Sequence, residues 1–241
     1  MPDFQHLLLF IAAGWLLNLT PGPDVLYIVT NSLRSGARAG IVAGLGITAG
    51  CFVHIFAAAL GVSALLATSA TAFTVLKWIG AAYLLWIGVK ILFARSPKTT
   101  DLAAVAASAP PLALREVFIG GFWTNVLNPK VAIFFLAFVP QFIAPGTENK
   151  ALAFVLLGAL FNLNAIPVNT GWALVAAWAA KRLSGAGAQR RAAPSKHSPL
   201  GGQRSTRSDQ RGGLFTWLDR AAGVMFIAFG IRLALSDNPS N

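Results

Sequence analysis

The sequence is poor in charged residues and in cysteine, and each shortage excludes a class of protein. Only 11% of the 241 residues are Asp, Glu, Lys or Arg, whereas soluble globular domains carry roughly 25%. Cys51 is the only cysteine, which excludes an intramolecular disulfide and a metal site built from clustered cysteines. Hydrophobic residues make up 56% of the chain. This composition favours a protein of the lipid bilayer, because hydrocarbon does not solvate charge.

Acidic residues are especially few, with 8 Asp and Glu against 19 Lys and Arg and a formal net charge of +11. In a soluble protein this balance would suggest nucleic acid, but here the basic residues lie mainly between apolar stretches and no nucleic-acid motif accompanies them. The sequence also contains no set of zinc ligands and no Gly-x-Ser-x-Gly turn. We therefore expect no nucleic-acid partner, no metal, no cofactor and no enzymatic activity.

Apolar stretches long enough to cross a bilayer, which takes about 20 residues, recur along the chain. The N-terminus lacks the basic segment of a signal peptide, so we expect the first stretch to be retained as a span. The sequence predicts an all-α, polytopic integral membrane protein with six transmembrane helices. Their expected bounds are 4–33, 39–66, 72–93, 117–143, 151–180 and 214–235.

Lys and Arg gather in every second connection, and this pattern predicts the orientation in the membrane. They follow the first, third and fifth spans, whereas the opposite side carries little beyond Lys77, Lys150 and Arg232. Because basic connections stay in the cytoplasm, we expect both termini to lie outside. The segment 184–213 is rich in Gly, Ser, Arg and Gln, and we expect it to form a disordered cytoplasmic loop.

The two halves of the chain resemble each other around a proline. Trp15 precedes Pro21 by six residues, as Trp123 precedes Pro129. A repeat of three spans is odd in number, so its second copy must be inverted, and inverted repeats with matched broken helices point to a transporter site at the bilayer midplane. The predicted organisation is a first repeat over 1–94, a cytoplasmic connection over 95–115 and a second repeat over 116–241.

Prolines are expected to break the first and fourth spans. Pro21 and Pro23 lack a backbone N–H, and Gly22 between them permits conformations closed to other residues. Asn128-Pro129 interrupts the fourth span in the same way. Backbone groups freed by such breaks are tolerated in lipid only where they face protein or a wet cavity. We therefore expect the two broken helices to line a common central site.

Asp24 and Lys130 each follow a break and are the ionisable groups that we single out there. A carboxylate inside an apolar span usually lines an ion or substrate path, and Asp24 could exchange a proton there or simply cap the next half-helix. Lys130 could pair with Asp24, hold a substrate carboxylate, or snorkel to the surface. The predicted substrate and proton path comprises Asn18, Thr20, Pro21, Gly22, Pro23, Asp24, Asn125, Asn128, Pro129 and Lys130.

Other polar residues within the spans allow two interpretations. Polar side chains in membrane helices often serve only to join helices, and a lone histidine such as His54 is more often such a structural hydrogen bond than a titrating group. Asn162, Asn164 and Asn169 flank Pro167 in the fifth span. They either line the path or mark a kinked, less buried helix.

Several of these segments together resemble a known family. They are Leu19-Thr20-Pro21-Gly22-Pro23-Asp24, residues 77–88, Asn128-Pro129-Lys130 and Phe138-Val139-Pro140-Gln141-Phe142. In them the chain is similar to the LysE/RhtB family of amino-acid exporters, over about residues 5–180 and 215–235. The resemblance implies export of amino acids or close derivatives in exchange for protons, a bacterial inner membrane, and a functional core at the Pro-Gly-Pro-Asp and Asn-Pro-Lys motifs. The long polar segment 184–213 and the asparagines of the fifth span depart from the family pattern.

The sequence therefore predicts a secondary transporter that exports amino acids or close derivatives from the cytoplasm by proton antiport. Its expected partners are a small amino acid, protons and the lipid bilayer, while the particular amino acid and homo-oligomerisation stay open. The alternatives are a membrane-embedded enzyme and a membrane scaffold that acts through its basic loop. Deleting 185–212 separates the scaffold from the exporter, because transport should survive if the loop is only a connector.

Overall fold

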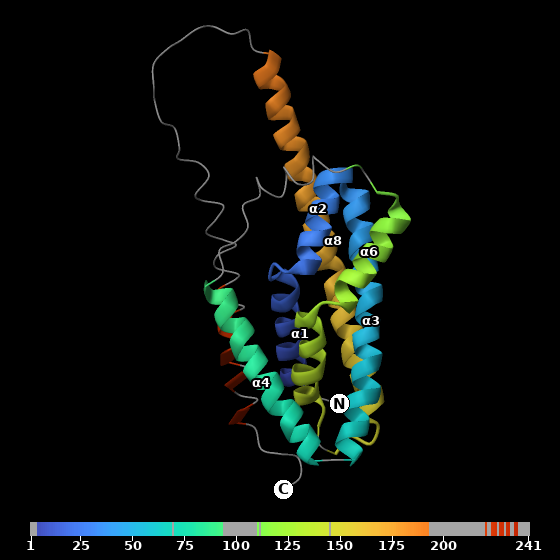
Figure 1. Cartoon of the computed structure of the whole chain (residues 1–241), viewed down its shortest axis with the longest axis vertical. Helices are drawn as coiled ribbons and strands as arrows, with labels where there is room; N and C mark the ends of the chain where they lie inside the picture. The colour runs from blue at the N-terminus through green and yellow to red at the C-terminus, as the bar shows by residue number, and fades with distance from the viewer. Residues whose placement is uncertain are drawn as a thin grey trace.

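The computed structural model describes residues 4–68, 70–93, 110, 112–144, 146–192 and, further on, 220, 223–225, 227–228, 230–231 and 234–235. In these parts of the chain every regular element is a helix (Figure 1). The elements are α1 (Phe4–Leu19), α2 (Pro23–Ser35), α3 (Ala37–Thr68), α4 (Ala70–Phe93), α6 (Leu114–Val126), α7 (Pro129–Ile133), the π-helical turn η1 (Phe134–Phe138), the 3-10 turn η2 (Val139–Phe142) and α8 (Lys150–Ala192).

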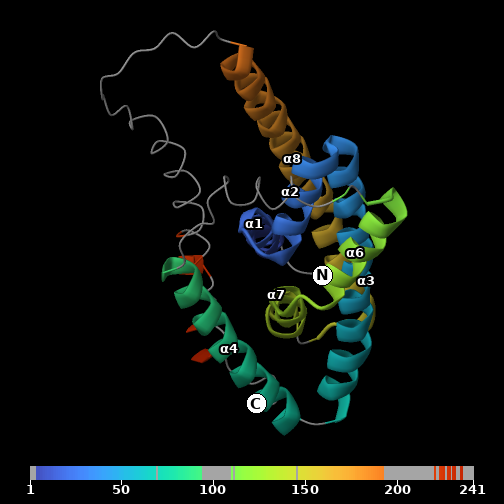
Figure 2. The same ribbon diagram turned by 45° about the horizontal axis from the view of Figure 1, so that its top comes forward.

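Both breaks lie where the prolines predict them. The first expected span divides into α1 and α2 around Pro21 and Gly22, and the fourth divides into α6 and the α7–η2 segment at Asn128. The two parts of the fourth span are bent by 48° relative to each other. The α7–η2 segment lies between α4 and α3 (Figure 2).

Two helical stretches are long and apolar enough to cross a membrane, namely Ala37–Gly61 and Lys150–Arg182. The bent pair of α6 and the α7–η2 segment makes a third if it forms one span. The apolar stretches Gln5–Leu19 and Trp78–Lys90 are shorter. Most of the expected sixth span lies outside the described residues, so the count of six and the inverted repeat stay predictions.

The end of α8 corrects one expectation. We expected 184–213 to lack regular structure, but the helix continues through 184–192 and ends at Ala192. Several of the residues that lengthen it, such as Ala and Arg, favour helix, and a helix already nucleated within the bundle propagates at little cost. The remainder of the segment, 193–213, lies outside the described residues.

Helix α3 is the centre of the bundle and packs against α6 and α8. A methyl group at Gly50 would lie 2.5 Å from the carbonyl oxygen of Phe122, and one at Gly121 would lie 2.5 Å from that of Ala43. The backbones of α3 and α6 are thus in direct contact, which only glycine permits, and small residues are what membrane helices use for such close approach. Residue numbers rise together along this contact, so the two helices run parallel.

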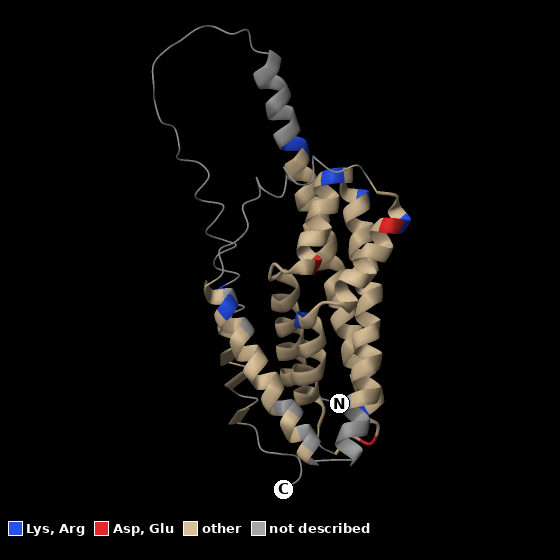
Figure 3. Cartoon of the chain, in the orientation of Figure 1, with Lys and Arg blue, Asp and Glu red and all other residues tan. Residues whose placement is uncertain are grey.

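Basic residues gather at one end of the bundle. Helix α8 runs antiparallel to α3, since Gly44 packs on Asn169 and Gly158 packs on Ile55. The carboxyl end of α2, the starts of α3 and α6 and the late part of α8 therefore lie at the same end (Figure 3). This end carries Arg34, Arg38, Arg115, Lys181 and Arg182. The clustering agrees with the charge pattern of the sequence, while the orientation itself stays a prediction.

A cluster of phenylalanine side chains fills the bundle around η1, away from the basic end. Phe134 packs against Phe138 with ring centroids 4.8 Å apart and against Phe161 of α8 at 4.9 Å. Phe10 of α1 joins the same cluster, with its centroid 5.2 Å from that of Phe142. Aromatic pairs at such distances gain about 0.5–1.5 kcal/mol beyond the burial of their area. The cluster thus forms a buried aromatic core next to the polar centre of the bundle.

The close contact between α3 and α6 leads to a first testable prediction, on the stability of a glycine variant. Replacing Gly121 with alanine should lower the free energy of unfolding by about 1–3 kcal/mol, because the new methyl group forces the two backbones apart. The matched control is Gly171→Ala in α8, where a methyl group would meet nothing within 4 Å. Thermal unfolding of both variants in detergent measures the difference. Equal stability of the two variants would contradict the close contact.

Candidate functional site

The two broken helices meet at their breaks, and each supplies a side chain to the other. The Lys130 Nζ atom at the start of α7 donates to the carbonyl oxygens of Leu17 at 3.1 Å and Thr20 at 3.2 Å. The Asn125 Nδ2 atom near the end of α6 donates to Asp24 Oδ2 in the first turn of α2 at 2.9 Å. Carbonyls left open at the end of α1 thus accept hydrogen bonds from a cation, which the negative end of a helix dipole favours.

Local chemistry at each break explains why the chain turns there. The Thr20 hydroxyl donates to the Leu16 carbonyl oxygen at 2.6 Å and helps to end α1. Pro23 then occupies the first turn of α2, where its missing N–H costs nothing. At the second break, Asn128 Oδ1 accepts the backbone N–H of Lys130 at 3.0 Å and caps α7.

Asp24 is not the N-cap of α2, which was one of the two roles expected from the sequence. Gly22 occupies the N-cap position, and no side chain makes a capping hydrogen bond there. The carboxylate points instead towards α6, where it accepts the bond from Asn125. Its negative charge in the first turn still interacts favourably with the helix dipole.

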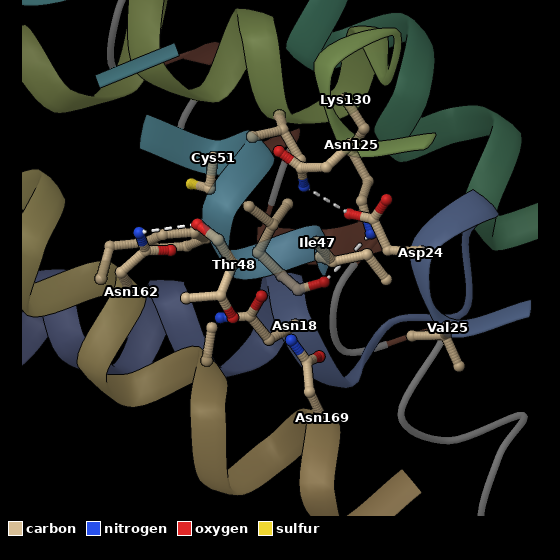
Figure 4. Close-up of a pocket in the computed structure, with 14 residues that line it drawn as sticks. Asn18, Asp24, Val25, Ile47, Thr48, Cys51, Asn125, Lys130, Asn162 and Asn169 are labelled. Carbon is tan, nitrogen blue, oxygen red and sulfur yellow. Dashed lines mark hydrogen bonds between the residues drawn. The ribbon is translucent and has the colours of Figure 1, made fainter. Parts of the chain in front are cut away.

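A pocket opens beside the two breaks, between α1, α2, α3, α6, α7 and α8 (Figure 4). Its cavity volume is about 20 Å³, room for about one water molecule, so the described state is packed tightly around the two breaks. Its lining combines one carboxylate, one ammonium, several carboxamides and an apolar remainder. The lining residues are Leu17, Asn18, Asp24, Val25, Ile47, Thr48, Cys51, Asn125, Lys130, Val131, Phe161, Asn162, Ala165 and Asn169.

The residues predicted for the path divide into two groups. Four of them, Asn18, Asp24, Asn125 and Lys130, line the pocket. The others shape the two breaks beside it: Thr20, Pro21, Gly22, Pro23, Asn128 and Pro129. The wall from α3 and most of the wall from α8 were missed, because an apolar span gives no signal of which of its faces is turned inward.

Two of the three asparagines in the fifth span line the pocket and one does not. Asn162 and Asn169 are among its lining residues, whereas Asn164 accepts the indole N–H of Trp15 at 3.3 Å. The sequence drew attention to this group but left its role open. His54 contacts the backbone carbonyl oxygen of Asn125 at 2.9 Å. This contact supports the structural interpretation of His54 rather than a place in the pocket.

Several polar atoms in the pocket wall make no hydrogen bond to another part of the protein. Among the described residues, Asp24 Oδ1, Asn125 Oδ1, Asn162 Oδ1 and Asn18 Nδ2 are buried and make no hydrogen bond. Leaving one such group unsatisfied costs about 1–3 kcal/mol. Three acceptors and one donor therefore depend on partners from outside the protein, which water or a polar ligand supplies.

Comparison with known proteins shows the family to which this chain belongs. Residues 15–194 match the family model of the LysE type translocator. The chain belongs to this family. A homoserine/homoserine lactone efflux protein of Salmonella typhimurium is 31% identical to the translocator over 179 residues, covering 73% of this chain and 84% of the relative. No solved structure matches.

Two further relatives extend the comparison. A leucine efflux protein of Enterobacter sp. (strain 638) is 28% identical over 154 residues, covering 64% of the translocator and 71% of the relative. An uncharacterized membrane protein of Vibrio cholerae is 35% identical over 156 residues, covering 65% and 73%. The family match over residues 15–194 includes both breaks and the residues that line the pocket.

The hydrogen bonds of Lys130 generate the second prediction. Lys130→Met in the translocator should lower the free energy of unfolding by about 1–3 kcal/mol, because the carbonyls of Leu17 and Thr20 lose their donor in an apolar setting. Lys150→Met at the far end of the bundle is the matched control. Unfolding of the purified proteins in detergent measures both. A loss of equal size in the control would show that Lys130 has no special role at the break.

Proposed function

We propose that this translocator is a secondary transporter that exports amino acids or close derivatives from the cytoplasm, with the pocket at the two breaks as its substrate site. One observation carries the proposal. A carboxylate and an ammonium, each from a different broken helix, line the same buried pocket together with unsatisfied amide atoms. Buried ionisable groups in a membrane bundle are costly, and they are retained where they handle a substrate or an ion.

The pocket is complementary to the two charged ends of an α-amino acid. An α-ammonium group has three N–H donors, and Asp24 Oδ1 and Asn125 Oδ1 are buried acceptors without partners. The substrate carboxylate finds a positive charge at Lys130 and an amide donor at Asn18 Nδ2. Hydrogen bonds that involve charged groups are about twice as strong as neutral ones, so these contacts can replace the water that the substrate loses.

The two named relatives support this assignment. Their names assign them homoserine or homoserine lactone in one case and leucine in the other. Both free amino acids share the ammonium and carboxylate groups and differ in the side chain. The shared part fits the charged end of the pocket, and the variable part fits the remaining wall, which is mostly apolar.

The position of the breaks at the centre of the bundle also suggests how transport would proceed. In the proposed cycle the two repeats rock around the pocket, so that it opens to each side in turn. The phenylalanine cluster around η1 adjoins the pocket through Phe161, which belongs to both, and η1 is a π-helical turn, a feature often found at functional sites. Asp24 would take up a proton when the substrate ammonium leaves. One proton crossing a potential of 100 mV supplies about 2.3 kcal/mol, enough for a useful gradient of substrate.

The same proposal includes the cellular setting. The basic end of the bundle faces the cytoplasm of a bacterial cell, the protein lies in the inner membrane, and both termini lie outside. The positive charges at that end support this orientation. The partners are the amino acid, protons and the bilayer.

Efflux from cells preloaded with labelled amino acids tests the function. Cells that contain the protein should release at least one amino acid faster than cells without it. Asp24→Asn should reduce that release by roughly tenfold or more, because the substrate ammonium loses its charged acceptor. The matched control is Glu148→Gln, which removes an exposed carboxylate between η2 and α8. The amount of each variant in the membrane is measured in parallel.

Each outcome of this experiment is informative. Normal release by the control and loss of release by Asp24→Asn supports a substrate or proton role for Asp24. Full release by Asp24→Asn would remove Asp24 from the site. If no amino acid leaves faster although the protein is present in the membrane, the proposed export is wrong and the family membership alone stands.

A further inference from the structure

A second, smaller apolar core lies between the pocket and the basic end of the bundle. Its buried residues, which we call the basic-end core, are Ile28 of α2, Ala43 and Ile47 of α3, Val117 of α6 and Ala173 of α8. Ile47 also lines the pocket, so the core and the pocket are in direct contact. A path from the pocket to the basic end therefore leads past these side chains.

The order of residues along the helices supports this placement. In α2, Val25 lines the pocket, Ile28 belongs to the basic-end core, and Arg34 lies at the basic end. The same order of pocket, core and basic residues holds in α3, α6 and α8. Ile28 and Ala173 have no exposed surface. Four helices thus close on one another between the pocket and the basic end.

Helix α2 is the element of this core best suited to move. It is 13 residues long, and a glycine adjoins each of its ends. Gly22 precedes it at the first break, and Gly36, with a φ of 81°, joins it to α3. Hinges are a few residues at the ends of elements that absorb changes in backbone angle, and they are often small. The chain therefore has a hinge position on either side of α2.

Tyr27 holds α2 against α6. Its hydroxyl donates to the carbonyl oxygen of Val117 at 3.0 Å, and its ring packs against the basic-end core. Gly120 leaves room for the phenol, because a methyl group there would clash with the hydroxyl. Asn31 and Ser32, by contrast, donate to carbonyl oxygens of α2 itself. The bond of Tyr27 thus fixes the position of α2 relative to a neighbouring helix, which the bonds of Asn31 and Ser32 do not.

We propose that α2 is the gate between the pocket and the basic end, and that the hydrogen bond from Tyr27 to Val117 holds this gate closed. A swing of α2 away from α6 breaks the bond, opens the basic-end core and exposes the pocket. Asp24 lies in the first turn of the same helix, so a ligand that binds Asp24 acts directly on the gate. The inference rests on the proposed function, in which the pocket is the transport site, and adds how access to it is controlled.

Cys51 makes this gate measurable in the otherwise unchanged protein. It is the only cysteine of the chain, it lines the pocket, and it is 2% exposed. The cavity of about 20 Å³ has no room for a thiol reagent, so Cys51 reacts only when the pocket opens. A small, positively charged methanethiosulfonate, which does not cross the bilayer, is the probe. Mass spectrometry of the intact protein follows the fraction of Cys51 that has reacted.

The reaction is measured separately from each face of the membrane. Spheroplasts and inverted membrane vesicles containing the full-length protein present opposite faces to the probe. Reaction of the exposed Lys181 with an impermeant amine reagent shows which preparation presents the basic end. The comparison therefore does not depend on the predicted orientation.

Tyr27→Phe should raise the rate of Cys51 modification from the basic face by about three- to tenfold, the effect of losing one hydrogen bond. The rate from the opposite face should stay unchanged, because α2 closes only the basic end. The matched control is Tyr83→Phe, which removes a hydroxyl from α4 outside the pocket lining. It should react as slowly as the wild type from both faces.

A second pair of variants breaks the same bond without changing Tyr27. Gly120→Ala places a methyl group where the phenol lies and should also speed the reaction from the basic face. Gly171→Ala in α8, where a methyl group would meet nothing within 4 Å, is its control and should not. Agreement between Tyr27→Phe and Gly120→Ala would assign the effect to the hydrogen bond itself.

The outcomes separate the gate from the export function, because the modification of Cys51 needs no transported amino acid. A faster reaction from the basic face alone supports the gate even if no amino acid is exported. Equal rates in Tyr27→Phe and the wild type would overturn it. A similar rise from both faces would show a general loosening of the bundle, and no reaction in any variant would show that α2 does not open. Either result would also overturn the inference.

Discussion

The structure depends on how two interrupted helices satisfy their backbone within an apolar bundle. A break near the middle of a span leaves carbonyl and N–H groups without intrahelical partners, and lipid offers none. Here the Lys130 ammonium bonds the open carbonyls at the end of α1, while Asn125 of α6 binds the Asp24 carboxylate of α2. Each broken helix therefore satisfies polar groups of the other. The two breaks lie together because these hydrogen bonds join them.

This mutual support makes the proposed substrate site part of the packing between the two helix pairs. The groups that would bind an amino acid are the same groups that connect α1 and α2 to α6 and α7. A ligand that competes for Asp24 or Lys130 changes those connections, and only such a differential interaction lets a ligand shift a conformational equilibrium.

The breaks and the long helices contribute different chemical groups to the pocket wall. The breaks supply charge, which suits the ammonium and carboxylate shared by all α-amino acids. Helices α3 and α8 supply the remaining wall, where Thr48 orients Asn162. Relatives named for homoserine and for leucine share the family of this chain, and the proposed division between a common charged part and a variable side-chain wall agrees with those two names.

Composition, proline positions and charge spacing by themselves determined the helical membrane class, both breaks and the basic end, and they singled out Asp24 and Lys130, which both line the pocket. These features follow from local chemistry, since proline cannot donate a backbone hydrogen bond and charge is rare in lipid. Only the tertiary structure decided that Lys130 bonds the end of α1, that Asp24 faces Asn125 rather than capping α2, and that Asn162 faces inward while Asn164 does not. An apolar helix carries little information about its own rotation, because lipid and protein neighbours favour the same side chains. Which face meets the pocket is therefore decided by contact with other helices.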